Sequence, residues 1–260
     1  MSCIPTGYGN PRFPGQLGGY GLRYPEEAAA WTPADLGADL LSAWDIWDDT
    51  KVTLNGGDVS AVADTKSVES LVQASASNQP TLQAEYWNNE DAAQFTRSET
   101  DRLVAAANSS YDTPGTLGLF MVGIPLSYTT AAFVATHSLS SDYIYLNVVS
   151  TNTLRAVIKG TNIDYNHGSN WAAPASEPLA VFAQLKADGT RELYVNGSLV
   201  GSIAGAVPGG GTHNGTSIGA SIAGANPSAA AVSHLAVTKE LDSTQIADYM
   251  SWAATKFGIT

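Results

Sequence analysis

Residues 191–200 read RELYVNGSLV, and this stretch shows the strand pattern of the chain most plainly. Leu193 and Val195 alternate with Tyr194, so the two aliphatic side chains point to one face of a strand and the ring points to the other. Asn196-Gly197 follows at once and tolerates the positive φ angles that a two-residue hairpin turn needs. The pattern therefore predicts two antiparallel strands with one buried face.

Strand-like runs of the same kind recur along the chain, separated by turn signals such as Asn55-Gly56-Gly57 and Asp188-Gly189. Many short strands without helical segments between them predict an all-β sandwich of two antiparallel sheets. The expected strands cover residues 40–47, 60–63, 94–95, 117–124, 131–136, 143–149, 154–158, 179–185, 192–195, 199–203, 216–218 and 232–238.

A short helix is expected at each end of this domain. At the first, Thr32 can cap the helix, Pro33 suits its first position and Asp35 complements its dipole. At the second, Asp242 and Gln245 form the pattern of a capping box. The apolar residues that then share one helix face are Ile246, Met250, Ala253 and Phe257, and Gly258 ends the helix.

The composition limits the class of protein. The chain has 260 residues, of which 44 % are hydrophobic and 14 % charged, with a formal net charge of −12. An acidic surface repels phosphate backbones, so nucleic acid is excluded as a partner. Cys3 is the single cysteine, which excludes a disulfide within the chain. We find no secretory signal and no apolar run long enough to insert in a membrane.

Residues 1–30 differ from the rest of the chain. Glycines and prolines alternate there, so the stretch cannot form a helix or a strand ladder of its own. Exposed rings gain nothing in water, and we interpret the stretch as an arm that packs on a partner or a neighbouring subunit; the alternative is a flexible tail. The chain then divides into this arm and a domain over 31–260. The four rings of the arm are Tyr8, Phe13, Tyr20 and Tyr24.

Several motifs, in order and spacing, carry a resemblance. They are WTPADL at 31–36, LLSAWD at 40–45, GDVS at 57–60, QPTL at 79–82, AQF at 93–95, LYVNGSLV at 193–200, SIGA at 217–220 and LDSTQI at 241–246. Over about residues 31–258 the chain resembles the concanavalin-A-like (laminin-G-like) jelly-roll domains of phage and bacterial proteins. The resemblance implies a concanavalin-A-like jelly-roll sandwich. It does not fix the function, because this fold serves lectins, glycosidases, adhesion modules and virion proteins.

Catalytic motifs are missing from the sequence. Glycosidases of this fold carry the string Glu-x-Asp-x-x-Glu on one strand, which places a pair of carboxyl groups in the cleft. The nearest string is Glu99-Thr100-Asp101, and we expect Arg97 and Arg102 to neutralise it. We therefore expect a protein that binds without catalysis; the alternative is a hydrolase or lyase that degrades glycans.

The acidic cluster Asp45, Asp48 and Asp49 is the strongest candidate for a metal site, since Ca²⁺ takes several oxygen ligands. The series Asp-x-Asp-x-Asp with a glycine turn is absent, so we interpret these residues as strand-edge charges that face outward. We expect no cofactor. Of the scattered histidines, His234 is expected to lie on the sheet with its hydrogen bonds satisfied.

The segment 165–171 combines rings with groups that form hydrogen bonds. Tyr165 and Trp171 could stack on the apolar face of a sugar while neighbouring amides and an imidazole bind its hydroxyls. The alternative is a turn whose rings fill the core. The predicted glycan contacts are Tyr165, Asn166, His167, Asn170 and Trp171.

The hypothesis that unites these features is a structural protein of a bacteriophage virion. Its arm would hold a lectin-like domain on other virion proteins, and the domain would bind a glycan of the host surface. Such a protein is made in the host cytoplasm and we expect it to be a homo-oligomer. The alternatives of capsid decoration, head fibre and tail appendage stay open.

Overall fold

The computed structural model describes residues 30–109, 116–127, 132–168 and 177–260. Within it, Trp31–Thr260 forms one compact unit. The four rings of the predicted arm lie outside the described residues, as do Asn170 and Trp171, so the roles assigned to them stay predictions. No helix in the described part of the chain is long and apolar enough to cross a membrane.

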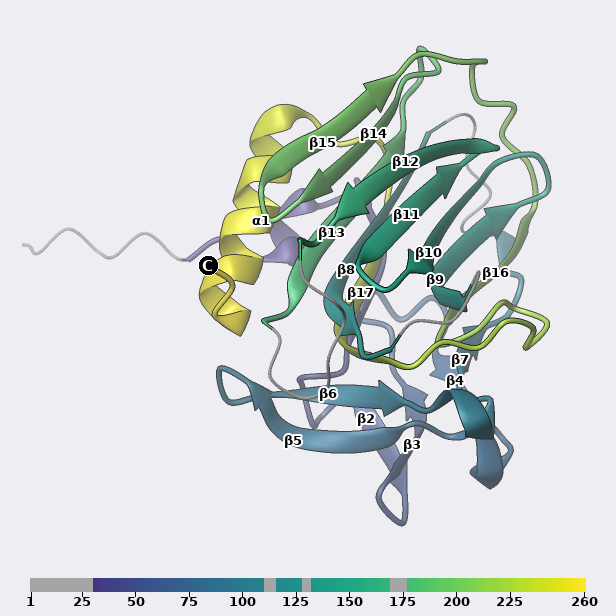
Figure 1. The fold of residues 1–260 in the computed structure, drawn as a ribbon, viewed down its shortest axis with the longest axis vertical. Helices are drawn as coiled ribbons and strands as arrows, with labels where there is room; N and C mark the ends of the chain where they lie inside the picture. Colours follow the sequence, from purple (N-terminus) through teal and green to yellow (C-terminus); the bar gives the residue numbers. More distant parts are fainter. Residues whose placement is uncertain (1–29, 110–115, 128–131, 169–176) are drawn as a thin grey trace, which may run out of the picture. The chain divides into compact units, whose positions relative to one another are not determined.

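Strand pairing links 17 strands into one antiparallel network, which folds into two main layers (Figure 1). The first layer has the spatial order β1-β17-β8-β13-β14-β15, with every neighbouring pair antiparallel. Its strands are β1 (Leu40–Asp45), β8 (Leu117–Pro125), β13 (Leu179–Leu185), β14 (Arg191–Val195), β15 (Ser198–Ile203) and β17 (Ala230–Thr238).

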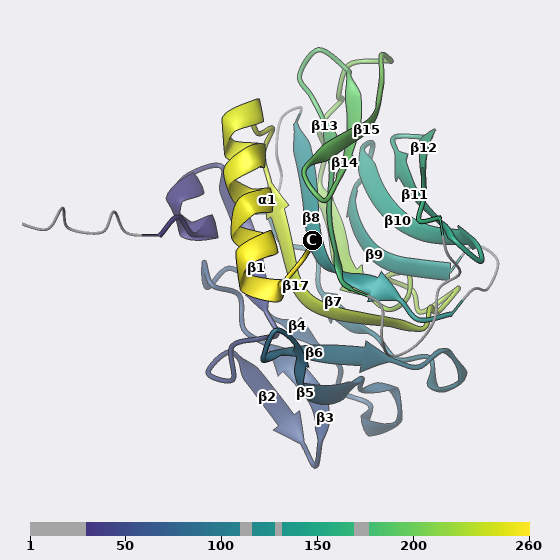
Figure 2. The same cartoon turned by 60° about the vertical axis from the view of Figure 1, so that its left-hand side comes forward.

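The second layer has the order β4-β7-β16-β9-β10-β11-β12 and lies opposite the first (Figure 2). Its strands are β4 (Leu71–Val72), β7 (Leu103–Ala105), β9 (Ala132–Leu139), β10 (Tyr143–Ser150), β11 (Thr153–Ile158), β12 (Thr161–Asn166) and β16 (His213–Ile218). The remaining strands β2 (Val52–Asn55), β3 (Asp58–Val62), β5 (Thr81–Trp87) and β6 (Glu90–Phe95) connect the layers through the pairs β3–β4 and β6–β17.

The hairpin predicted from residues 191–200 is confirmed. Val195 pairs with Ser198, which leaves Asn196 and Gly197 as a two-residue turn between β14 and β15. Their φ angles are 48° and 79°. Two successive positive φ values define the turn that matches the twist of a hairpin, and Asn-Gly is its preferred sequence.

The central strands β8, β13 and β17 of the first layer are buried on both faces. On β8, Leu119 and Met121 belong to the core between the layers, whereas Phe120 and Val122 belong to a second core on the outer face. The helix α1 (Ser243–Phe257) covers that outer face (Figure 2). Burial on both faces explains why residues 117–124 read as a continuous apolar run instead of an alternating one.

The predicted closing helix is confirmed in detail. The Asp242 carboxylate accepts hydrogen bonds from the backbone N–H groups of Thr244 and Gln245, and the Gln245 side chain accepts one from the Asp242 N–H. Gly258 ends the helix at a φ of 67°. The opening helix is shorter than a standard α-helix: it is the single 3-10 turn η1 (Pro33–Leu36), followed later by η2 (Ala76–Asn78) and η3 (Arg97–Glu99).

An all-β, jelly-roll-like fold is thus confirmed, with some strands beyond those expected. The first strand ends at Asp45 and not at Trp47. The strands β2, β4, β5, β7 and β12 were not predicted. They are either two or three residues long or half-exposed and polar, so they carry little of the apolar alternation on which the prediction depends.

Candidate binding cleft

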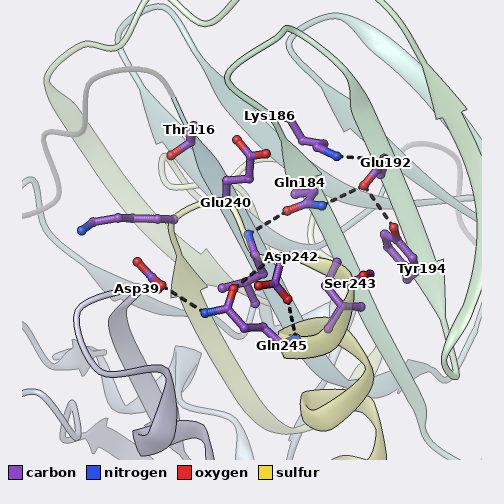
Figure 3. Close-up of a pocket in the computed structure, with 13 residues that line it drawn as sticks. Asp39, Thr116, Gln184, Lys186, Glu192, Tyr194, Glu240, Asp242, Ser243 and Gln245 are labelled. Atoms are coloured by element: carbon purple, nitrogen blue, oxygen red, sulfur yellow. Dashed lines mark hydrogen bonds and ion pairs between the residues drawn. The ribbon is translucent and has the colours of Figure 1, made fainter.

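A cleft of about 660 Å³ opens on the outer face of the first layer, beside the N-terminus of α1. Figure 3 shows side chains that enter it from β13, β14, the β17–α1 link and the first turn of α1. Its volume falls in the range of small-molecule pockets, roughly 300–1,000 Å³. The cleft is lined by Asp39, Thr116, Gln184, Lys186, Glu192, Tyr194, Lys239, Glu240, Leu241, Asp242, Ser243, Gln245 and Ile246.

Gln184 and Glu192 form the floor of the cleft. They are cross-strand neighbours on β13 and β14, and both are buried. The Gln184 Nε2 donates to Glu192 Oε2 at 2.8 Å, and Gln184 Oε1 accepts from the backbone N–H of Leu241 at 3.1 Å. Because buried amide and carboxylate groups cost free energy when unpaired, these bonds fix both side chains in place.

Tyr194 extends the same network toward the opening. Its hydroxyl donates to Glu192 Oε2 at 3.1 Å, and the Lys186 ammonium lies 3.5 Å from Glu192 Oε1. Burial raises the pKa of Tyr194 to about 12, and the Glu192 charge and hydrogen bond act in the same direction. The phenol therefore keeps its proton at neutral pH and serves as a donor.

The opposite wall is held by the start of α1. Gln245 Nε2 donates to Asp39 Oδ2 at 3.1 Å, and Glu240 Oε2 accepts from the backbone N–H of Ala187 at 2.8 Å. These bonds join segments that are distant in sequence. The wall is therefore ordered before any ligand arrives, which lowers the entropy cost of binding.

The cleft combines many groups for hydrogen bonding with modest net charge. Its lining has four carboxylates against two ammonium groups, together with amides and the hydroxyls of Thr116, Tyr194 and Ser243. Among the described residues that line it there is no histidine or cysteine, so none of them is an imidazole that could activate Ser243 as a nucleophile. Such a set of donors and acceptors suits a polar, uncharged ligand with several hydroxyl groups.

This cleft was not predicted from the sequence, although one signal was present. Gln184 is the single polar residue of the strand Leu179–Leu185. A polar side chain in a strand that is buried on both faces must find a partner there, and the Glu192 carboxylate is that partner. The position of the capping box beside this pair follows from the tertiary fold alone.

The predicted glycan segment 165–171 is described up to residue 168. Tyr165 is the second-to-last residue of β12. It packs partly against the core between the layers, with its ring centroid 6.4 Å from that of His167. Asn166 Oδ1 accepts from Asn152 Nδ2 at 2.9 Å and from the backbone N–H of Gly168 at 2.9 Å. Tyr165, Asn166 and His167 are thus neighbours, and their contact with a glycan stays a prediction.

The acidic cluster 45–49 is arranged differently from the expectation. Trp44 is buried in the core, and Asp45 does not face outward to solvent. Its Oδ1 lies 2.7 Å from His234 Nδ1 and accepts from Trp47 Nε1 at 3.1 Å. Asp48 accepts from the backbone and hydroxyl of Thr50. Among the described residues, no group of three or more His, Cys, Asp or Glu side chains is placed to hold a metal ion.

The prediction for Asp101 was wrong. We expected a solvated charge neutralised by Arg97 and Arg102, but Asp101 is 1 % exposed. Its Oδ2 accepts from the Thr96 N–H at 2.7 Å, while the Arg102 guanidinium donates to the carbonyl of Ile222. Burial, with the nearby charges of Glu99 and Asp58, raises the pKa of Asp101 to about 6.

Two other histidines form a buried pair that the sequence did not indicate. The rings of His137 and His213 stack with centroids 4.8 Å apart, and Thr216 Oγ1 lies 2.7 Å from His137 Nδ1 and 3.2 Å from His213 Nε2. His213 Nδ1 accepts from the backbone N–H of Asn108, so its Nε2 carries the proton. Thr216 Oγ1 therefore accepts a hydrogen bond from the Nε2–H of His213, and the Thr216 hydroxyl donates its own hydrogen to His137 Nδ1.

Comparison by sequence identifies no relative: no family model matches the chain, and no curated protein matches it. Comparison by structure does find similar proteins. One is a chain from work stating that cell entry of botulinum neurotoxin type C depends upon interaction with two ganglioside molecules, with a TM-score of 0.58 at 10 % identity, covering 85 % of this chain and 53 % of that one.

Two further matches are a receptor-binding domain and a binding domain of botulinum neurotoxins. The mosaic serotype C/D domain has a TM-score of 0.57 at 11 % identity and covers 83 % of this chain and 51 % of that one. The serotype G domain has a TM-score of 0.55 at 10 % identity, with the same coverage of 83 % and 51 %. The chain thus spans about half the length of these solved structures. Identity this low shows the fold alone, which is an all-β sandwich of the jelly-roll kind.

Proposed function

We propose that residues 31–260 form a carbohydrate-binding module without catalytic activity, and that the cleft beside α1 is its site. The observation that carries the proposal is the preordered network on the cleft floor, in which Gln184, Glu192 and Tyr194 hold one another. Support comes from the structural neighbours. One is a receptor-binding domain of a botulinum neurotoxin, and another comes from work on the dependence of botulinum neurotoxin type C on two ganglioside molecules for cell entry.

A saccharide fits the chemistry of this cleft. Sugar hydroxyls donate to carboxylates and accept from ammonium, amide and phenol groups, all of which line the cleft. A single shallow site of this kind binds weakly, with a Kd of about 1 mM, equivalent to roughly −4 kcal/mol. Useful retention on a cell surface then needs several copies presented together, which can raise avidity by ~10²–10⁴.

The finer proposal concerns how copies are presented. The resemblance to jelly-roll domains of phage proteins and the aromatic arm of residues 1–30 favour a virion protein that displays this module. Its partners would be capsid or tail proteins bound through the arm. Deletion of residues 1–30 should leave a soluble domain that unfolds cooperatively but no longer joins purified particles. Normal assembly of the truncated chain would contradict the role of the arm.

Calorimetric titration of the full chain with a panel of neutral saccharides tests the module. Ser243 is an exposed residue at the first position of α1 and lines the cleft, so Ser243→Tyr should fill the cleft and abolish binding with the melting temperature unchanged. Glu192→Gln should weaken binding roughly 10-fold or more, because hydrogen bonds to a charged group contribute about 1.5–3 kcal/mol. Glu99→Gln, an exposed carboxylate outside the cleft, is the matched control.

Two other outcomes would relocate or replace the proposal. If Asn166→Ala with His167→Ala abolishes binding while Ser243→Tyr preserves it, the site lies at the segment 165–171. If the chain releases reducing sugar from a glycan panel, the alternative of a hydrolase holds, and loss of that release in Glu192→Gln would place the reaction in the cleft. A lyase would instead be detected by the unsaturated product it forms.

A further inference from the structure

The strand β15 lies at an edge of the first layer. Within the described residues it pairs with β14 and with no other strand, and Figure 1 shows it as the light-green strand beyond β14. One side of its backbone therefore has N–H and C=O groups without a ladder partner. An open edge of this kind is a template for a further strand.

Each face of this edge carries an exposed aliphatic side chain. Leu199 pairs with Tyr194 and so lies on the outer face, where its side chain is 52 % exposed. Ile203 pairs with Arg191, on the face of Leu193 that looks toward the second layer, and it is 40 % exposed. Val200, at the bulge between these pairings, packs against the core instead. Exposed aliphatic side chains on each face would lose contact with water when another strand docks.

This edge also has none of the charges that usually protect one. The sequence from Leu193 to Thr238 contains no Asp, Glu, Lys or Arg, so no charge is found on β15 or in the loop that follows it. The edge strand β12 differs, because it presents Asp164 in a bidentate ion pair with Arg155. Charged side chains on an edge strand are a common barrier to unwanted pairing.

The net charge of the chain also bears on which partner docks at β15, and it is compatible with a second copy at this edge. The chain carries a formal net charge of −12, so two copies repel each other over most orientations. An uncharged edge is where they can approach without opposing carboxylates. Identical strands placed antiparallel about a two-fold axis complement each other, since each residue of one copy meets its counterpart in reverse order.

We propose that β15 is a dimer interface, at which the β15 strands of two copies pair antiparallel and continue the first layer from one subunit into the other. The assembly then has two clefts, one on each subunit, in a fixed relation. This inference does not depend on what the cleft binds.

Sedimentation velocity of the full chain over a wide range of concentrations tests the proposal. The wild-type chain should show a reversible dimer. The double variant Leu199→Lys, Ile203→Lys should raise the dimer Kd by at least about tenfold, a change of roughly 1.4 kcal/mol, because two ammonium groups per copy would face one another across the interface.

Val72→Lys is the matched control. The Val72 side chain is 48 % exposed, a fraction similar to the 52 % of Leu199. It lies on β4, however, which pairs with β3 on one side and with β7 on the other. This control should dimerise like the wild type. Amide hydrogen exchange over 198–203 should be slower at dimer-forming concentrations in the wild type and the control, and in the double variant this slowing should need at least about tenfold higher concentrations.

A wild-type chain that stays monomeric would overturn the proposal, and so would a double variant that dimerises as tightly as the wild type. Melting temperatures of all the variants separate loss of pairing from loss of fold. If the double variant unfolds, the single variant Leu199→Lys on the outer face replaces it under the same criteria.

Discussion

His234 Nε2 lies 2.7 Å from the hydroxyl oxygen of Tyr249, and both side chains are fully buried. His234 belongs to β17 and Tyr249 to α1, while Asp45 on β1 holds the other ring nitrogen at 2.7 Å. With Nδ1–H donating to Asp45, Nε2 accepts from the Tyr249 O–H. Burial, together with the Asp45 charge, raises the pKa of Tyr249 well above 10, so the phenol keeps this proton. The chain of bonds fixes the helix to two strands of the first layer.

Tyr249→Phe should destabilise the domain although it conserves the ring. The Tyr249 ring stacks on Phe120 with a centroid distance of 3.8 Å, and this contact survives the change. The buried His234 Nε2 would lose its partner, which costs about 1–3 kcal/mol. For a domain of this size each kcal/mol lowers the melting temperature by roughly 2–4 °C. Scanning calorimetry measures the shift, and an unchanged melting temperature would show that the hydrogen bond contributes nothing net.

Phe257→Ala should be more damaging, because it removes a whole buried side chain. Phe257 is 1 % exposed in the second core and meets Trp252 edge to face at 5.7 Å. Such a truncation costs roughly 3–5 kcal/mol. The control is the exposed neighbour Thr255→Ala, which should change the free energy of unfolding little. Lys256 is unsuitable as a control because it pairs with Glu90 at 2.8 Å and lies over the Trp47 ring.

The sequence predicted those parts of the structure that depend on residues close together in the chain. The Asn196-Gly197 turn, the capping box at Asp242 and the apolar face through Phe257 each depend on residues a few positions apart. Local geometry dictates these features whatever the rest of the chain does. The same reasoning placed His234 correctly on the sheet with its hydrogen bonds satisfied.

The candidate site could not be predicted in this way, because its residues meet only in the folded chain. Gln184 and Leu241 are 57 positions apart, and Asp39 and Gln245 are 206 apart. The surroundings of Asp45 and Asp101 were missed for a similar reason. Asp45 bonds to His234, 189 positions away, and Asp101 is buried with the Thr96 N–H as its donor, while Arg102 bonds to Ile222, 120 positions away. Charge in a sequence does not reveal exposure when the covering element is distant.

The His137–His213 pair should make the domain less stable in acid. Burial, with the adjacent His213, lowers the pKa of His137 well below 6.5. Near pH 6.5 His137 therefore takes up a proton in the unfolded chain but stays neutral in the folded chain. The free energy of unfolding then falls as the pH drops below this value, by up to about 1.4 kcal/mol per pH unit. Urea unfolding between pH 8 and 5 measures the slope, which should be smaller in His137→Gln. An equal slope in that variant would exclude His137 as the cause.

The Asp101 carboxyl should make the domain less stable as the pH rises, whereas His137 makes it less stable as the pH falls. Because its pKa is raised to about 6, the folded state binds a proton more readily than the unfolded state. The stability it contributes is fully present below about pH 4 and is lost as the pH rises through 6. Asp101→Asn stays uncharged, and its amide oxygen can still accept from the Thr96 N–H. We expect this variant to gain on the order of 1–2 kcal/mol relative to the wild type between pH 4 and pH 7.5.

The control for Asp101 has the opposite sign. A hydrogen bond from the backbone N–H of Thr190 lowers the pKa of the exposed Asp188, so Asp188→Asn should lose stability relative to the wild type as the pH rises through about 4, and it should show no relative gain between pH 4 and pH 7.5. Urea unfolding at the two pH values gives both differences. If Asp101→Asn shows no relative gain at the higher pH, then the carboxylate is ionised in the folded protein without penalty, and a rearrangement around Thr96 that hydrates it must accompany its ionisation.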